Sequence, residues 1–240
     1  MPRGFEDYEN PSYSIAGRTI DISQMILSLS GVYSLDGLGR VIYADDFKDG
    51  IGAYQIVDTF TPGALIATGK EAELGAVSMS VDVGTPGVGG QKDVFKQLTA
   101  SPTQSVGVQS SVAWYTAASL YYLRLEYTDG TINRSGILKI DPATRNVSYY
   151  SGAGYVVLTQ LPILPTLVTW VPLKMVLNLS DNTYRRLIVG NTVYDIDGTL
   201  AAPSVIFPGR GLGFGWTFDR SGAVDKIGYI GHVLVTLDDP

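Results

Sequence analysis

Glycoside hydrolysis is the first chemistry that the carboxylates of this chain could perform. It needs two carboxylates, which stand about 5 Å apart when one of them is the nucleophile. The 240 residues include glutamate only at positions 6, 9, 71, 73 and 126. Glu71 and Glu73 lie two residues apart with no aspartate between them, and Glu126 lies close to the turn at Asp129–Gly130. Solvated surface or turn positions explain these glutamates, so we predict no glycosidase activity and no catalytic residue.

Nucleophilic catalysis is the second chemistry to test. The chain contains no cysteine, which excludes thiolate nucleophiles, thiolate metal sites and disulfides together. A serine–histidine pair would have to use His232, the only histidine, and no Gly-x-Ser-x-Gly motif presents a serine. His232 lies within a strand-like run, and a structural or outward-facing position explains it. We therefore predict no esterase activity.

Clustered aspartates could bind a calcium ion, because hard cations take oxygen ligands. Asp45, Asp46 and Asp49 form one such cluster and are our candidate metal site. Asp195 and Asp197 begin a second loop, but Ile206 stands at its twelfth position, where a bidentate glutamate is needed. Turn capping by aspartate explains both clusters without metal. The sequence predicts no cofactor other than this candidate calcium ion.

Charge and hydropathy exclude several classes of partner. The chain has 17 Lys plus Arg against 23 Asp plus Glu, and its basic residues are scattered, so no nucleic-acid partner is expected. Residues 97–123 and 151–173 carry no charge, but the first stretch is polar and the second holds three prolines. The N-terminus is polar and acidic, unlike a signal peptide. We expect a soluble protein without a membrane partner, located in the cytoplasm of the cell that makes it.

Tyrosine is used 15 times and includes two adjacent pairs, Tyr121–Tyr122 and Tyr149–Tyr150. Neighbouring residues of a strand point to opposite faces, so one tyrosine of each pair should point outward. Exposed tyrosine can stack on a sugar ring or anchor a protein interface. Packing at the rim of the core is an equally good explanation.

Short strand-like runs dominate the chain from residue 40 onward. Residues 76–83 alternate apolar and polar side chains with a period of two, and turn residues follow most other runs. Ten or more such runs at regular spacing predict an all-β sandwich or barrel. Residues 1–39 differ and form an N-terminal extension, in which 21–30 fits a short helix or a strand equally well. The other expected strands are Val41–Phe47, Val106–Tyr115, Tyr121–Tyr127, Gly136–Asp141, Asn146–Tyr150, Lys174–Leu179, Tyr184–Val189, Thr192–Ile196, Gly211–Phe218 and Ile227–Leu237.

Three passages resemble the concanavalin A-like lectin and glucanase superfamily, which includes laminin G-like modules. They are Tyr43–Tyr54, the run from Trp170 to Leu179 with the hairpin after it, and Ile227–Val235. The resemblance covers residues 40–240 and implies an antiparallel two-sheet jelly-roll sandwich, in which Val41–Phe47 lies beside Ile227–Leu237. It also implies that Trp170, Leu173, Met175 and Leu187 lie in the core or at its edge. Gly231 and His232 stand where Asp and Asn are usual in this superfamily.

This resemblance leads to three hypotheses about function. A sandwich with a short arm, no cysteine and no signal peptide is similar to a structural component of a phage virion, which is our main interpretation. Its partners would be other subunits of an assembly or further copies of itself. The alternative is a carbohydrate-binding, lectin-like module with a glycan partner. A divergent glycoside hydrolase is the third hypothesis, which the missing glutamate pair disfavours.

The extension itself generates a prediction. Phe5, Tyr8 and Tyr13 stand among prolines and glycines, which interrupt a helix. The three aromatic rings are also more apolar than a solvent-exposed, disordered terminus requires. We expect these three side chains to dock on another surface. Deleting residues 1–18 should then leave the thermal transition unchanged and lower the mass of the oligomer measured by light scattering. An unchanged assembly state would contradict the docking role.

Overall fold

The computed structural model describes residues 13–15, 18–20, 39–47, 49–58, 65–68, 78–82, 90–100, 104–114, 119–130, 133–161, 170–196, 211–220 and 227–239. The chain divides into two units, residues 1–37 and residues 38–240. In the first unit, β1 (Tyr13–Ile15) pairs antiparallel with β2 (Arg18–Ile20). Tyr13 therefore belongs to a strand, whereas Phe5, Tyr8 and residues 21–30 lie outside the described residues. The docking role and the boundary at residue 39 stay predictions.

The second unit contains a seven-stranded sheet in which every neighbouring pair is antiparallel. β9 lies near its middle, between β10 and β16. In spatial order the strands are β12 (Tyr155–Gln160), β11 (Asn146–Tyr150), β10 (Asn133–Asp141), β9 (Ser119–Thr128), β16 (Gly211–Arg220), β7 (Gly90–Leu98) and β4 (Gln55–Asp58).

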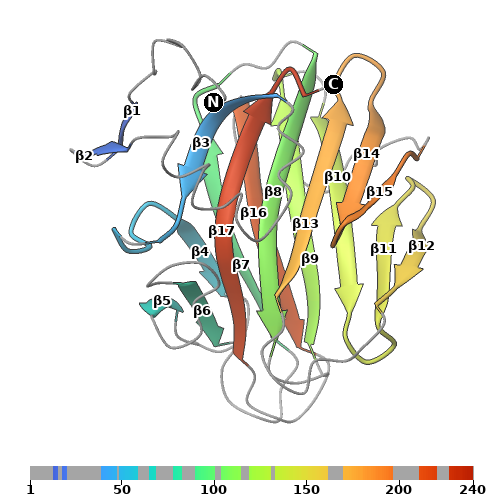
Figure 1. Cartoon of the computed structure of the whole chain (residues 1–240), viewed down its shortest axis with the longest axis horizontal. Helices are drawn as coiled ribbons and strands as arrows, with labels where there is room; N and C mark the ends of the chain where they lie inside the picture. The colour runs from blue at the N-terminus through green and yellow to red at the C-terminus, as the bar shows by residue number, and fades with distance from the viewer. Residues whose placement is uncertain are drawn as a thin grey trace, which may run out of the picture. The chain divides into compact units, whose positions relative to one another are not determined.

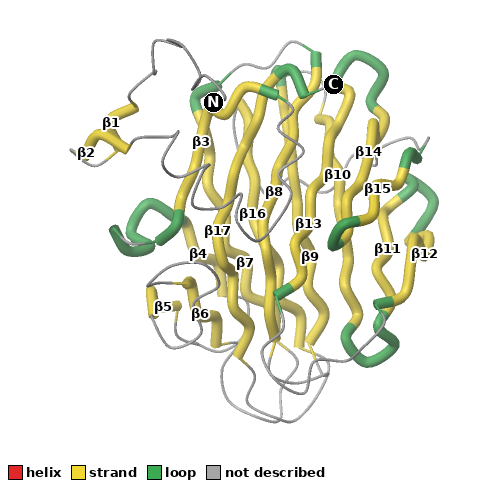
Figure 2. The backbone as a smooth tube through the Cα atoms, viewed as in Figure 1, coloured by secondary structure: helices red, strands yellow, loops and turns green. Residues whose placement is uncertain are grey.

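An eight-stranded antiparallel sheet lies face to face with the first (Figure 1). Its strands are β15 (Thr192–Tyr194), β14 (Thr183–Val189), β13 (Val171–Asn178), β8 (Ser105–Trp114), β17 (Ile227–Leu237), β6 (Ser78–Asp82) and β5 (Leu65–Thr68), and β3 (Arg40–Asp45) also pairs with β17. Figure 2 shows strands and loops and no helix among the described residues, and none of these residues forms a helix able to span a membrane. The prediction of an all-β two-sheet sandwich is confirmed.

β17 is shared by three other strands. One edge pairs with β8, and the other edge pairs with β6 through Ile227–Ile230 and then with β3 through Val233–Leu237. This confirms that Val41–Phe47 lies beside the last strand. The change of partner falls at a register shift between Ile230 and Val233, where a β-bulge adds one residue to β17. The bulge holds His232, which is buried, with its Nδ1 atom 3.5 Å from the hydroxyl oxygen of Ser111.

The core lies between the inner faces of the two sheets. On β16 the alternation of side chains points Phe214, Trp216 and Phe218 inward, and the indole N–H of Trp216 donates a hydrogen bond of 3.2 Å to the Ser110 hydroxyl of the other sheet. Leu173, Met175 and Leu187 are buried as predicted, and Trp170 lies at the edge, half-buried, with its ring 6.5 Å from that of Tyr229. The four residues predicted to lie in the core or at its edge are therefore confirmed.

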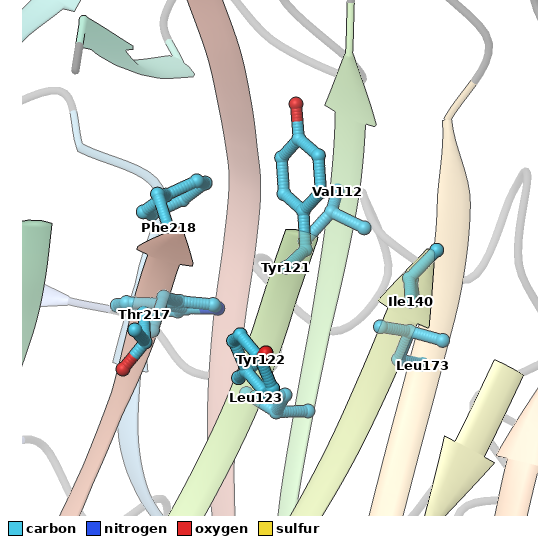
Figure 3. A pocket seen from close by; sticks show the side chains of 9 residues that line it. Val112, Tyr121, Tyr122, Leu123, Ile140, Leu173, Thr217 and Phe218 are labelled. Carbon is cyan, nitrogen blue, oxygen red and sulfur yellow. The ribbon is translucent and has the colours of Figure 1, made fainter. Parts of the chain in front are cut away.

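One cavity between the sheets has a volume of about 10 Å³, room for a single water molecule. Figure 3 shows its lining: Thr217 and Phe218 come from β16, Tyr121, Tyr122 and Leu123 from β9, Ile140 from β10, Val112 from β8 and Leu173 from β13. A cavity of this size cannot hold an organic ligand.

A buried carboxylate ties the end of β17 to the neighbouring strands. Asp239 is fully buried, and one of its carboxylate oxygens lies 2.7 Å from Lys174 Nζ and accepts a hydrogen bond of 2.7 Å from the Thr236 hydroxyl. The guanidinium of Arg186 donates to the other oxygen. Gly107 of β8 makes room for this group, because a Cβ there would lie 2.8 Å from Asp239 Oδ2.

We expect Asp239→Asn to lower the free energy of unfolding by about 3 kcal/mol, because it removes the anion from between two largely buried cations. The measurement is urea unfolding followed by tryptophan fluorescence. The matched control is Asp238→Asn, because Asp238 is 57% exposed and lies 4.0 Å from an exposed Arg40. The control should change stability by less than about 0.5 kcal/mol. Equal effects of the two substitutions would show that the buried ion pairs add nothing.

Candidate functional site: the outer face of the seven-stranded sheet

The alternation of side chains along β9 defines two faces. Tyr121, Leu123 and Leu125 are buried against the other sheet. The residues between them therefore point to the outer face of the seven-stranded sheet. They are Tyr122, Arg124 and Glu126, and the strand pairing places Lys139, Ile137 and Ser135 of β10 and Thr217, Gly215 and Gly213 of β16 beside them.

Three tyrosines gather on this outer face, and we call them the tyrosine cluster: Tyr122, Tyr150 and Tyr155. They come from β9, β11 and β12. The rings of Tyr150 and Tyr155 meet edge to face with centroids 5.2 Å apart, and the Tyr122 and Tyr155 centroids are 6.1 Å apart. Tyr155 is 43% exposed, and Tyr122 and Tyr150 are half-buried. The cluster therefore offers both aromatic surface and hydroxyl groups to solvent.

The adjacent pairs behave as the sequence predicts. Tyr121 is buried and packs on Phe218 at 5.2 Å, whereas Tyr122 points outward. Tyr149 turns inward and its ring lies 5.4 Å from that of Tyr184 in the other sheet. One member of each pair therefore points toward the other sheet and the other toward the outer face. The contact of Tyr122 with Tyr155 was not predicted.

Two cations lie against the tyrosine cluster. Lys139 Nζ is 5.1 Å from the ring centre of Tyr155, and the guanidinium carbon of Arg124 is 5.9 Å from that of Tyr122. Both distances fit cation–π contacts. Burial first, and then the nearby Tyr155 and Asp219, raise the pKa of Tyr122 to about 12. Its hydroxyl therefore stays neutral at physiological pH and can both donate and accept hydrogen bonds.

Glu126 corrects an expectation from the sequence. We predicted a solvated position near a turn, but the side chain is buried and only 8% exposed. Its neighbours on the adjoining strands are Ser135 of β10 and Gly213 of β16. Burial raises the pKa of Glu126 to about 7, with a smaller raising effect from Asp93 and an opposing effect from Arg124. The carboxyl group therefore titrates close to neutral pH, where groups at functional sites often do.

The other acid near Glu126 does not complete a 5 Å pair. Asp93 of β7 accepts a hydrogen bond of 2.5 Å from the Thr217 hydroxyl and two from the Gln91 side chain. Asp93 of β7 is opposite Thr217 of β16, and Thr217 is opposite Tyr122 of β9. Asp93 is therefore two strands away from β9 and level with Tyr122, four residues before Glu126. Their Cα atoms are therefore more than about 9 Å apart. This arrangement gives no support to a retaining glycosidase mechanism.

The candidate calcium site has other partners in the structure. The Asp45 carboxylate accepts hydrogen bonds from the Tyr43 hydroxyl at 2.7 Å, the Tyr54 hydroxyl at 3.0 Å and the Phe47 N–H at 2.7 Å. Asp46 is half-buried and Asp49 is exposed. Within the described ranges, no group of three or more acidic or histidine side chains is placed to hold a metal ion. Calcium binding at Asp45, Asp46 and Asp49 stays a prediction.

Several residues considered in the sequence lie outside the described ranges. Glu71, Glu73 and Asp197 are among them, with Phe5 and Tyr8 of the candidate interaction surface. The sequence missed Lys139, Arg124 and Tyr155 as neighbours of Tyr122. The alternation of side chains along each strand indicates that these residues point outward. It does not show which strands lie side by side.

A scan against protein-family models finds no match, and a search of curated proteins finds none. Among solved structures, the chain is similar to the cellulose-induced protein Cip1, with a TM-score of 0.51 and 17% identity over 81% of this chain and 96% of that one. It is also similar to a sialidase, with a TM-score of 0.54 and 10% identity over 84% of this chain. The chain spans only 19% of that sialidase. A Bacillus licheniformis β-glucanase gives a TM-score of 0.49 and 11% identity over 82% of this chain and 98% of that one.

These comparisons establish the fold. The chain has an antiparallel two-sheet jelly-roll sandwich, as predicted from the sequence, and shares this fold with Cip1 and with part of the sialidase. Identities between 10% and 17% carry no information on activity. Neither Cip1 nor the sialidase is named as a virion component. The main hypothesis from the sequence therefore gains no support from them.

We expect Glu126→Gln to change how stability depends on pH. Because the pKa of Glu126 is about 7 in the folded state and 4.5 without the fold, the native protein holds this proton longer than the unfolded chain. The wild type therefore loses stability as the pH rises from about 4.5 to about 7, in total by about 3 kcal/mol. The variant should be more stable than the wild type at pH 8 by up to that amount and equal to it at pH 4. Urea unfolding at both values measures this.

The control for this experiment is Asp129→Asn. Asp129 lies at the turn after β9 and forms an exposed ion pair of 3.2 Å with Arg134. Its substitution should change stability by less than about 1 kcal/mol at either pH. A Glu126→Gln variant that is no more stable than the wild type at pH 8 would contradict the burial of an ionisable carboxyl group.

Proposed function

We propose that this chain is a carbohydrate-binding, lectin-like module and that the tyrosine cluster on its seven-stranded sheet contacts the glycan. The observation that carries the proposal is the half-exposed group of three rings from three strands, with Tyr155 43% exposed. Large aromatic side chains with polar tips are used where a ligand offers both apolar and hydroxyl surface. A sugar ring offers both, through its C–H faces and its hydroxyl groups.

The ammonium group of Lys139 can donate hydrogen bonds to those hydroxyl groups. Lys139 lies beside Tyr122 on β10, and its Nζ atom is 5.1 Å from the ring centre of Tyr155. A few fixed polar groups next to an apolar platform are typical of small-ligand sites, where they orient the ligand. This combination supports binding along several strands of one sheet face.

The names of the similar structures also favour this hypothesis over a virion role. One is a cellulose-induced protein and another is a sialidase, and both names refer to carbohydrates. The described residues offer aromatic rings and single carboxyl groups on this face, rather than a close carboxylate pair. We therefore propose binding without turnover, and a glycan in place of other virion subunits as the partner.

We expect the wild type to bind at least one member of a panel of soluble polysaccharides, measured by affinity electrophoresis and calorimetry. Tyr155→Ala should weaken that binding about tenfold, because it removes the most exposed ring of the cluster. Tyr155→Phe keeps the ring and should retain most of the affinity. Both variants should keep the far-UV circular dichroism of the wild type.

The control is Val193→Ala, an exposed apolar residue of β15 in the other sheet, 54% exposed. It should bind like the wild type. The proposal is wrong if no polysaccharide is bound, or if Tyr155→Ala binds as tightly as Val193→Ala. Release of reducing sugar by the wild type would contradict binding without turnover.

A further inference from the structure

Two cations share the outer face of β9 and β10 with the tyrosine cluster. Lys139 lies directly opposite Tyr122, and Arg124 lies opposite Ile137, two residues before Lys139. The two cations are therefore diagonal neighbours on adjacent strands, with Cα atoms roughly 7–8 Å apart. Both side chains are long enough to reach a single group placed between them.

Neither cation forms a salt bridge or a hydrogen bond with a described residue. Each contacts an aromatic ring instead, Lys139 that of Tyr155 and Arg124 that of Tyr122. Only the Nε atom of Arg124 is buried without a partner, whereas its two Nη atoms and Lys139 Nζ are not in that state. The charged ends of both side chains therefore stay available to a ligand.

Other cations of the sandwich are paired with acids. Arg134 lies 3.2 Å from Asp129, and Lys174 lies 2.7 Å from Asp239. Like charges on adjacent strands repel each other, and an anion close to both removes that repulsion. The pair formed by Arg124 and Lys139 is therefore suited to an anion that comes from outside the described sandwich.

The acidic side chains near this pair are directed elsewhere. Asp141 follows Lys139 by two residues, but its carboxylate accepts hydrogen bonds from the backbone N–H groups of Ala143 at 3.0 Å and Thr144 at 3.4 Å. These bonds hold the carboxylate at the turn after β10. Asp219 belongs to β16, so β9 separates its strand from that of Lys139.

The remaining acid beside Arg124 is Glu126, on the same strand. Burial raises the pKa of Glu126 to about 7, so its carboxyl group is largely uncharged below that pH. Burial also raises the pKa of Tyr155, and the positive charge of Arg124 opposes that rise. No acid of the described residues contributes to the shift at Tyr155. The exposed end of the tyrosine cluster is therefore a region of positive potential.

We propose that the glycan bound by the tyrosine cluster is acidic, and that Lys139 and Arg124 bind its carboxylate or sulfate group while a sugar ring stacks on Tyr155. The inference rests on the proposed glycan binding and adds the class of ligand. Ammonium and guanidinium groups form short, charge-assisted hydrogen bonds with anionic oxygens. An anion is also attracted to both charges at once, which a neutral hydroxyl group is not, so the site discriminates in favour of an acidic sugar.

The experiment compares polymers that differ in charge and share one backbone. Polygalacturonate and its highly methyl-esterified form are one pair, and dextran sulfate and dextran are the other, which distinguishes carboxylate from sulfate. Affinity is measured by calorimetry at pH 6, where the polymer carboxylates are ionised and Glu126 is mostly protonated. We expect the wild type to bind at least one charged polymer about tenfold more tightly than its neutral counterpart. Added salt should weaken this preference.

The test variants are Lys139→Gln and Arg124→Gln, which remove one charge each. Either should reduce the preference for the charged polymer to about threefold or less. Lys139→Arg keeps the charge and should keep the preference. The matched control is Arg185→Gln, which changes the net charge equally but removes an exposed cation from β14 of the other sheet. It should bind every polymer like the wild type.

The outcomes separate this inference from the proposed function. If the wild type binds a neutral polymer as tightly as its charged counterpart, the acidic ligand is wrong and glycan binding stands. The same conclusion follows if Lys139→Gln and Arg124→Gln keep the preference that Arg185→Gln shows. If the wild type binds neither pair of polymers nor any member of the wider panel, both proposals fail. Unchanged thermal transitions of the variants show that a loss of binding is not a loss of folding.

Discussion

The pairing of β17 with three strands is the constraint on which the sandwich depends. β17 joins β8 along one edge and both β6 and β3 along the other, so the first and last strands of the sandwich share one sheet. The bulge at His232 allows the change of partner without loss of alternation on either side. Asp239 then fixes the end of this strand through buried ion pairs to β13 and β14. With this sheet in place, the other sheet has one face to pack against.

That packing decides which side chains remain for function. Trp216 reaches Ser110 across the core, and Phe218 and Tyr121 pack together beside it. Because β9 alternates, burying Tyr121 and Leu123 sends Tyr122 and Arg124 to the outer face. The proposed binding face is therefore set by the same register that builds the core. No separate loop has to be ordered to present the three tyrosine rings.

The buried carboxyl groups of Asp239 and Glu126 have different surroundings. Around Asp239, every carboxylate oxygen has a partner and two cations balance the charge, which makes the group part of the framework. Around Glu126, burial raises the pKa of the carboxyl group to about 7 and one oxygen has no partner among the described residues. Burial therefore favours the protonated form of Glu126.

The amino-acid sequence by itself determined most of the strands, the class of fold and the outward phase of Tyr122, because the side-chain period of two is a property of each strand alone. It did not predict β4, β5, β7 and β12. The motifs at Val41–Phe47 and Ile227–Leu237 also placed the first and last strands together. Tertiary structure decided which strands lie side by side: β16 follows β9 by about 90 residues, and its Gly213 beside Glu126 belongs to no local pattern. Two tyrosine hydroxyls likewise bind Asp45, which the sequence marked as a metal ligand. The burial and the pKa of a side chain depend on its neighbours on adjacent strands. Those strands can be far apart in the sequence, as β9 and β16 are, so local spacing does not predict them.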